Sequence, residues 1–214
     1  MIRRLIVPLA LLATACAPRS VPAQVTTGAD STLRALVPAG HGQLPQDAIT
    51  LLLRSGNVEI RFTPLDERVT RLLSPDGYQA LQQLINRHRV QIDSATVRLG
   101  IRNAGLVLVT YFALAADTRF DPQLLNINSR NRLVRPGAVI PLSPAFSNQQ
   151  LNVGAQAMGL YIFEEPVPVT EPFSIEYLDA STADWERRLT RFDRERARIQ
   201  SRAGAGPGTS EGQR

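Results

Sequence analysis

Leu106 to Ala116 read LVLVTYFALAA, a nearly continuous apolar stretch in the middle of the chain. Such a run fits either a central strand that is covered on both faces or a buried helix. The run is short, and Val107, Val109 and Thr110 are β-branched, which favours a strand. We therefore predict that residues 106–115 form a central strand of a sheet, buried on both faces.

Short apolar segments separated by turn residues surround this strand. VEIRF (residues 58–62) alternates strictly between apolar and polar residues, and a Ser-Gly-Asn turn cluster precedes it, so residues 49–62 predict a β-hairpin. Further strands are expected at residues 95–103, 123–128, 133–142, 151–155, 159–164 and 173–178. Short strands at this spacing are typical of an antiparallel sandwich or barrel.

Residues 159–163, GLYIF, place Tyr161 in a position that resembles the corner tyrosine of immunoglobulin-like sandwiches. The chain lacks the paired cysteines of antibody domains, and its single tryptophan lies outside the predicted strands. We expect a mainly β fold, an antiparallel β-sandwich of the immunoglobulin-like or a related type. One flanking helix and a charged C-terminal helix would complete it.

The flanking helix is predicted near residues 75–89. Ser74 supplies an N-cap and Pro75 suits the first helical position. The apolar residues that follow recur at helical spacing and form one stripe: Tyr78, Leu81, Leu84 and Ile85.

The C-terminal helix is predicted over residues 181–202, with Ser181 to Asp184 as its cap. Its apolar stripe consists of Trp185, Leu189, Phe192 and Ile199. This stripe either packs on the protein's own sandwich, because a lone helix needs a buried face, or binds a partner helix. Arg196 falls within the stripe and disfavours a coiled coil.

The basic residues restrict the possible functions. The chain has 24 basic residues, all arginine, and a formal net charge of +5. The absence of lysine excludes a P-loop lysine, a Schiff base and a Ser-Lys dyad. The arginines are spread along the chain, whereas nucleic-acid binders concentrate them in a patch. We expect no nucleic-acid partner.

Cys16 is the only cysteine, and it follows a leader with three recognisable parts. Arg3 and Arg4 precede an apolar run (residues 6–12) and a small-residue segment, which is the layout of a secretory signal peptide. Residues 12–16, LATAC, resemble the lipobox of bacterial lipoproteins, with Ala13 where Leu is usual.

This resemblance implies removal of residues 1–15, lipidation of Cys16 and a place in the cell envelope. Ala17 follows the cysteine where retention in the inner membrane would favour Asp, which implies the outer membrane, at its periplasmic or surface face. The alternative is soluble export to the periplasm or medium, with cleavage after Ala23 and loss of Cys16.

Composition divides the rest of the chain. Residues 16–46 are rich in Pro, Gly and Ala and predict a flexible tether, of which a short piece near residues 33–37 docks on the domain. Residues 47–180 form the β-rich globular domain. Residues 203–214 have the low complexity of a disordered tail.

Few residues suggest catalysis. His41 lies in the predicted tether and His88 at a helix end beside two arginines, so neither predicts a triad. Glu164 and Glu165 at a strand end are candidates for a carboxylate dyad. Oxygen ligands for calcium would come from four residues, although their spacing fits loop turns better: Asp117, Asp121, Asn126 and Asn128.

We therefore expect no catalytic, cofactor-binding or metal-binding residues. The expected function is that of a non-enzymatic binding or assembly module, held on a membrane through Cys16 and meeting another envelope protein. One alternative is a carboxylate-dependent hydrolase of envelope glycan, which needs two converging carboxylates. The other is an apolar-ligand carrier, which needs an open apolar cavity.

Overall fold

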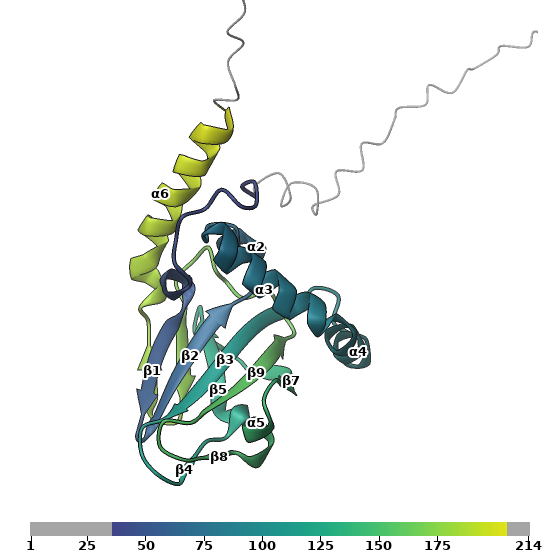
Figure 1. The fold of residues 1–214 in the computed structure, drawn as a ribbon, viewed down its shortest axis with the longest axis vertical. Coiled ribbons are helices and arrows are strands. Elements are labelled where there is room, and N and C mark those ends of the chain that lie inside the picture. Colours follow the sequence, from purple (N-terminus) through teal and green to yellow (C-terminus); the bar gives the residue numbers. More distant parts are fainter. Residues whose placement is uncertain (1–35, 205–214) are drawn as a thin grey trace, which may run out of the picture. The chain divides into compact units, whose positions relative to one another are not determined.

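The structure is a computed structural model that describes residues 36–204 (Figure 1). It is mainly β with antiparallel sheets, which confirms the predicted β-sandwich with flanking helices. The larger sheet has five strands, in the order β1 (Leu51–Ser55), β2 (Val58–Pro64), β3 (Gly105–Ala113), β9 (Gln156–Phe163) and β7 (Pro136–Pro141). The smaller sheet has four, in the order β11 (Ala180–Thr182), β10 (Ser174–Tyr177), β5 (Leu125–Ser129) and β6 (Arg132–Val134).

The remaining elements are two 3-10 helices, a two-stranded ribbon and the α-helices. Two 3-10 helices, η1 (Gln46–Ile49) and η2 (Pro122–Leu124), precede β1 and β5. A two-stranded ribbon joins β4 (Thr118–Arg119) and β8 (Gln150–Leu151). The helices are α2 (Glu67–Thr70), α3 (Pro75–Arg87), α4 (Arg89–Leu99), α5 (Pro144–Asn148) and α6 (Trp185–Gly204).

Residues 106–113 of the long apolar stretch lie in β3, the middle strand of the larger sheet. It pairs with β2 on one side and β9 on the other. Val107, Val109 and Tyr111 are fully buried between the sheets. Leu108 and Phe112 point to the other face and are only half-buried. The prediction of a central strand is confirmed, but its outer face is less covered than we expected.

The predicted hairpin is confirmed as β1 and β2, which pair in antiparallel register with Ser55 opposite Val58. Gly56 adopts a φ of 54° in the two-residue turn, a conformation that glycine reaches at little cost. Ile60 and Phe62 point inward and are fully buried. The apolar residues of the alternation share one buried face, while Glu59 on the other face is also buried and pairs with Arg54 and Arg61.

The flanking helix is confirmed as α3, with Pro75 at its start. The strand predicted at residues 95–103 is wrong, because residues 89–99 form the second helix α4. Thr96 and its β-branched neighbours favour a strand locally. The helix instead buries Ile92 and Ala95, which are three positions apart, and α4 contacts β7 and β9. Tertiary packing overrides the local preference.

Two further strand predictions need correction. The single strand predicted at residues 133–142 is two strands, β6 and β7, which belong to different sheets. Arg135 lies between them, where the chain crosses from one sheet to the other. The strand predicted at 151–155 shrinks to β8, and β11 was not foreseen.

Tyr161 does not act as a corner tyrosine, which bonds to backbone a few residues upstream. Its hydroxyl donates a hydrogen bond to the carbonyl of Pro122, 39 residues upstream. It also bonds to Tyr111, and this pair belongs to an aromatic cluster with Phe120 and Phe146 that fills the core.

The C-terminal helix is confirmed as α6, although it begins at Trp185, because residues 181–182 of the predicted cap belong to strand β11. It packs on the body beside the first described residues (Figure 1). Trp185, Phe192 and Ile199 are buried, and the Trp185 Nε1 donates to the carbonyl of Val169 at 3.1 Å. Leu189 is half-buried. In this structure the stripe therefore packs on the protein's own body, the first of the two alternatives.

Part of the predicted tether is also packed on the body. Val37 and Leu44 are buried, and Leu44 forms a parallel bridge with Leu73. The backbone N–H of Gln43 donates to Glu195 Oε1 of α6 at 2.7 Å. Residues 36–46 are therefore part of the folded unit, whereas the tether was predicted to continue to residue 46.

Candidate functional site

A surface cavity of about 300 Å³ lies where the connection between β9 and β10, residues 164–173, crosses the end of the β5–β6 hairpin. We call it the loop pocket. Its lining comes from α2, both sheets and this connection: Arg68, Ile127, Ser129, Arg130, Arg132, Val134, Phe163, Glu165, Pro166, Val167, Pro168, Thr170 and Glu171.

The floor of the loop pocket is apolar. Phe163 ends β9 and is fully buried, and Val167 of the connection is 1% exposed. Ile127 of β5 and Val134 of β6 are opposite each other in the register of the smaller sheet. These four side chains form the apolar part of the pocket lining, and Val134 is the only one of them that is half-buried rather than buried.

Two arginine–glutamate pairs form the rim. Arg132 pairs with Glu165, and Arg130 pairs with Glu171. The four side chains are 36% to 78% exposed. Exposed ion pairs contribute little net stability, about 0–1 kcal/mol, so a ligand with charges of its own replaces them at small cost.

Arg68 fixes the connection above the pocket. Its guanidinium donates to both carboxylate oxygens of Asp66 and, at 3.0 Å, to the carbonyl of Val167. The hydrogen bonds to Asp66 raise the pKa of Arg68. Gly105 lets the connection approach closely, since a Cβ there would come within 2.3 Å of the Glu165 carbonyl oxygen. The part of residues 164–173 that lines the pocket is thus fixed by Arg68 and by close packing on Gly105.

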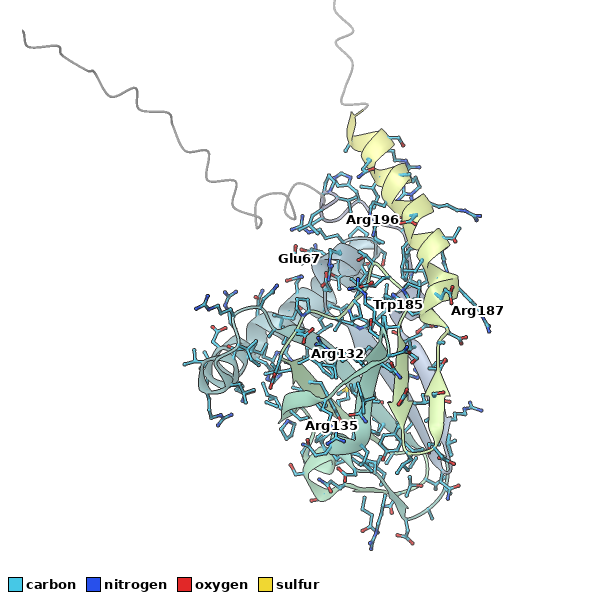
Figure 2. The ribbon with its side chains drawn as sticks, turned by 180° about the vertical axis from the view of Figure 1, so that it is seen from behind. Glu67, Arg132, Arg135, Trp185, Arg187 and Arg196 are labelled. Carbon is cyan, nitrogen blue, oxygen red and sulfur yellow. The ribbon has the colours of Figure 1, made fainter. Side chains whose placement is uncertain are left out.

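β6 is an edge strand beside the pocket. It pairs only with β5 within residues 36–204. A second depression of about 310 Å³ continues from the pocket along β6 and is lined by Arg132, Leu133, Val134, Arg135, Glu164 and Glu165. Figure 2 shows Arg132 and Arg135 on the same side of the molecule. The loop pocket and the second depression therefore both lie beside the free edge of β6, which is three residues long.

The predicted site residues are not brought together. His41 and His88 lie apart: the His41 carbonyl accepts from Arg198 of α6, while the His88 ring bonds to Gln91 between α3 and α4. Cys16 lies outside the described residues. Of the predicted dyad, Glu165 lines the loop pocket whereas Glu164 lines only the second depression.

The four oxygen-bearing residues considered for calcium have structural partners. Asp121 Oδ1 accepts the backbone N–H of Gln123, and Asn128 donates to Glu176. Asp117 accepts from the Gln150 amide. The Asn126 amide nitrogen donates to the Leu124 carbonyl, whereas its buried oxygen has no hydrogen-bond partner within residues 36–204. Within residues 36–204, no group of three His, Cys, Asp or Glu side chains is arranged to hold a metal ion.

Comparisons with known proteins give no family for this chain: no family model matches it, and neither a curated protein nor a solved structure does. In the part of the chain that the structure describes, no helix combines the length and apolar character needed to cross a bilayer.

The sequence contained one clue to the loop pocket. The hairpin turn at its rim, Arg130 and Asn131, has φ values of 51° and 60°, the conformation of a tight two-residue turn. The separate strands predicted at residues 123–128 and 133–142 already placed a break at this turn, between β5 and β6. The contact between the β5–β6 hairpin and residues 164–173 joins segments that are distant in the sequence, so no local sequence pattern predicts it.

Proposed function

We propose that this protein is an exported bacterial envelope protein, held on a membrane by a lipid on Cys16, that binds a segment of another envelope protein without catalysis. The observation that carries the binding role is the loop pocket beside the edge strand β6. The leader, with its lipobox-like residues 12–16, supports the anchor.

The occupant that fits these features is an extended peptide segment. A free strand edge offers backbone hydrogen bonds to an added strand, and a neighbouring pocket takes alternate side chains of that strand. The floor around Phe163 and Ile127 suits one apolar side chain. The rim pairs of Arg132 with Glu165 and Arg130 with Glu171 suit flanking charges of either sign.

A glycan hydrolase is supported by one observation, the presence of Glu165 and Glu171 in the same pocket. A general acid must carry a proton when it acts. Each of these carboxylates is instead paired with an arginine at the exposed rim of the pocket. This arrangement fits binding better than acid catalysis.

An apolar-ligand carrier has less support. The space between the sheets is filled by aromatic side chains, with Tyr111 stacked on Phe120 at a centroid distance of 4.4 Å. Phe146 meets the same cluster edge-on. The loop pocket itself has a charged rim, whereas a lipid chain requires an apolar entrance.

The binding role is tested by crosslinking in the producing bacterium. A photoreactive amino acid replaces the exposed Leu133 of β6, and in a control strain it replaces Leu178, which is also exposed but lines other hollows. We expect one specific envelope protein to be crosslinked from position 133 only. A synthetic peptide of its crosslinked segment should then bind the purified protein.

The matched variants are Arg132→Glu at the rim and Arg119→Glu on β4, two exposed arginines outside the core. Arg132→Glu should weaken peptide binding about ten-fold or more, because it places two carboxylates side by side. Arg119→Glu should leave it unchanged. Equal crosslinking from both positions, or equal loss in both variants, would contradict a site at the loop pocket.

The anchor is tested separately by the intact mass of the processed protein. A chain that begins at Cys16 and carries a diacylglyceryl group is the expected product. A lipid-free chain that begins at Gln24 would refute anchoring and leave a soluble exported protein.

A further inference from the structure

Helix α6 has two different long faces. One face carries the buried stripe of Trp185, Phe192 and Ile199. Another face carries four exposed arginines, which at 3.6 residues per turn fall within roughly a third of the helix circumference: Arg187, Arg191, Arg194 and Arg202. By the same helical spacing, Thr190 and Ser201 share this sector, and no acidic residue does. We call it the arginine face. Figure 2 shows Arg187 pointing away from the body.

The remaining arginines of α6 serve the protein's own structure. Arg188 donates to the carbonyls of Asp47 and Ala48. Arg198 falls in the same sector but is half-buried, and it donates to Glu195 and to the His41 carbonyl. The arginine face has no comparable internal role. Arg187 lies 3.3 Å from Asp184 but is 84% exposed.

The first described residues lie against the C-terminal half of α6. The contacts from Gln43 to Glu195 and from Arg198 to His41 hold them there. The proposed lipid on Cys16 lies twenty residues before Leu36 (36 − 16 = 20). Even fully extended, these residues span only about 70 Å. The anchor therefore limits the distance between Leu36 and the lipid on Cys16 to about 70 Å.

We propose that the arginine face docks on the anionic phospholipid headgroups of the leaflet that holds the anchor. The position of the helix in this proposal rests on the proposed anchoring, whereas its charge does not. Asp184 pairs with Arg187 at one end of the row, and a row of guanidinium groups on one face complements phosphate-bearing headgroups. Docking would turn a tethered body into an oriented one and would fix the side on which the loop pocket is presented.

The test measures membrane binding without the lipid. The full chain carrying Cys16→Ser is floated with vesicles of phosphatidylcholine that contain about one third phosphatidylglycerol, and with vesicles of phosphatidylcholine alone. We expect binding to the anionic vesicles only, weakened by salt, because screening reduces attraction between exposed charges. The leader is common to every variant compared, so its own affinity for lipid cancels.

Two triple variants remove the same charge from different surfaces. The first alters the arginine face: Arg187→Gln, Arg191→Gln and Arg194→Gln. The second alters exposed arginines of α3, α4 and the turn that follows: Arg87→Gln, Arg98→Gln and Arg102→Gln. At about five-fold per arginine, the first should lose about 100-fold in affinity for anionic vesicles, and the second far less.

Equal losses in the two triple variants would overturn the proposal, because net charge alone would then explain binding. Equal binding to phosphatidylcholine vesicles and to anionic vesicles would also overturn it, as would tighter binding to RNA than to the vesicles. Unchanged circular dichroism and thermal midpoint exclude unfolding as a cause. A lipidated mass together with failed flotation would leave the anchor in place and remove only the docking.

Discussion

The buried tyrosine pair predicts unequal effects for two chemically identical substitutions. The hydroxyls of Tyr111 and Tyr161 are 2.6 Å apart, and both side chains are fully buried. The Tyr161 hydroxyl donates its proton to the carbonyl of Pro122 at 3.1 Å. Tyr111 must therefore be the donor within the pair. Replacing either tyrosine by phenylalanine removes one hydroxyl, but the two replacements leave different polar groups without a hydrogen-bond partner.

Tyr111→Phe removes a donor and leaves Tyr161 bonded to Pro122. The expected loss is about 1 kcal/mol, the net value of one hydrogen bond. Tyr161→Phe leaves both the Tyr111 hydroxyl and the Pro122 carbonyl without this partner in the core. Leaving a buried polar group unpaired costs about 1–3 kcal/mol, so the expected loss is about 3 kcal/mol.

The double variant sharpens the prediction. Tyr111→Phe combined with Tyr161→Phe also removes the stranded hydroxyl, so it should be more stable than Tyr161→Phe alone. Urea unfolding, followed by the fluorescence of the buried Trp185, measures all three free energies of unfolding. Equal losses in the two single variants, or a double variant that is the least stable of the three, would refute the proposed direction of the bonds.

Two further predictions concern the dependence of stability on pH. Hydrogen bonds from Arg198, assisted by the N–H of Gln43, lower the pKa of Glu195. Glu195→Gln should therefore lower the free energy of unfolding by about 1–2 kcal/mol at neutral pH. In urea unfolding at about pH 3, the difference between wild type and variant should be smaller, because the wild-type carboxylate is then losing its charge. Burial raises the pKa of both Tyr111 and Tyr161, so the folded state retains protons that the unfolded chain releases, and stability should fall as pH rises above about 10. The chain has no lysine to titrate in this range, so alkaline unfolding that is identical in wild type and the double phenylalanine variant would contradict the second prediction.

Local patterns were sufficient for several elements. Strand β3 was predicted because a short run rich in β-branched residues has few alternatives, and the β1–β2 hairpin because alternation and a Gly-containing turn coincide. Helices α3 and α6 carry apolar residues at helical spacing behind recognisable start residues. In each case the information lies within about twenty residues of sequence.

Other features depend on contacts between distant residues. Helix α4 forms although Thr96 and its valine neighbours favour a strand, because Ile92 and Ala95 are buried. The division of one apolar segment into β6 and β7 depends on which sheet each half joins. The loop pocket requires β6 to meet Glu165, and only the fold brings the two together. Glu165 was recognised as a candidate, but its partner Arg132 was not.

The contact between residues 41–43 and helix α6 affects the order in which the protein can fold during its synthesis. Gln43 and its partner Glu195 are 152 positions apart, and Arg198 reaches the His41 carbonyl across 157. A ribosome makes residues 36–48 well before α6. Residues 36–48 therefore cannot make these contacts until α6 has been synthesised. Until then, Phe173 lacks its contact with Trp185, and the surface that α6 covers is exposed and apolar. Synthesis that stops short of α6 would leave both ends unfinished, so a truncated product would be a substrate for chaperones and proteases.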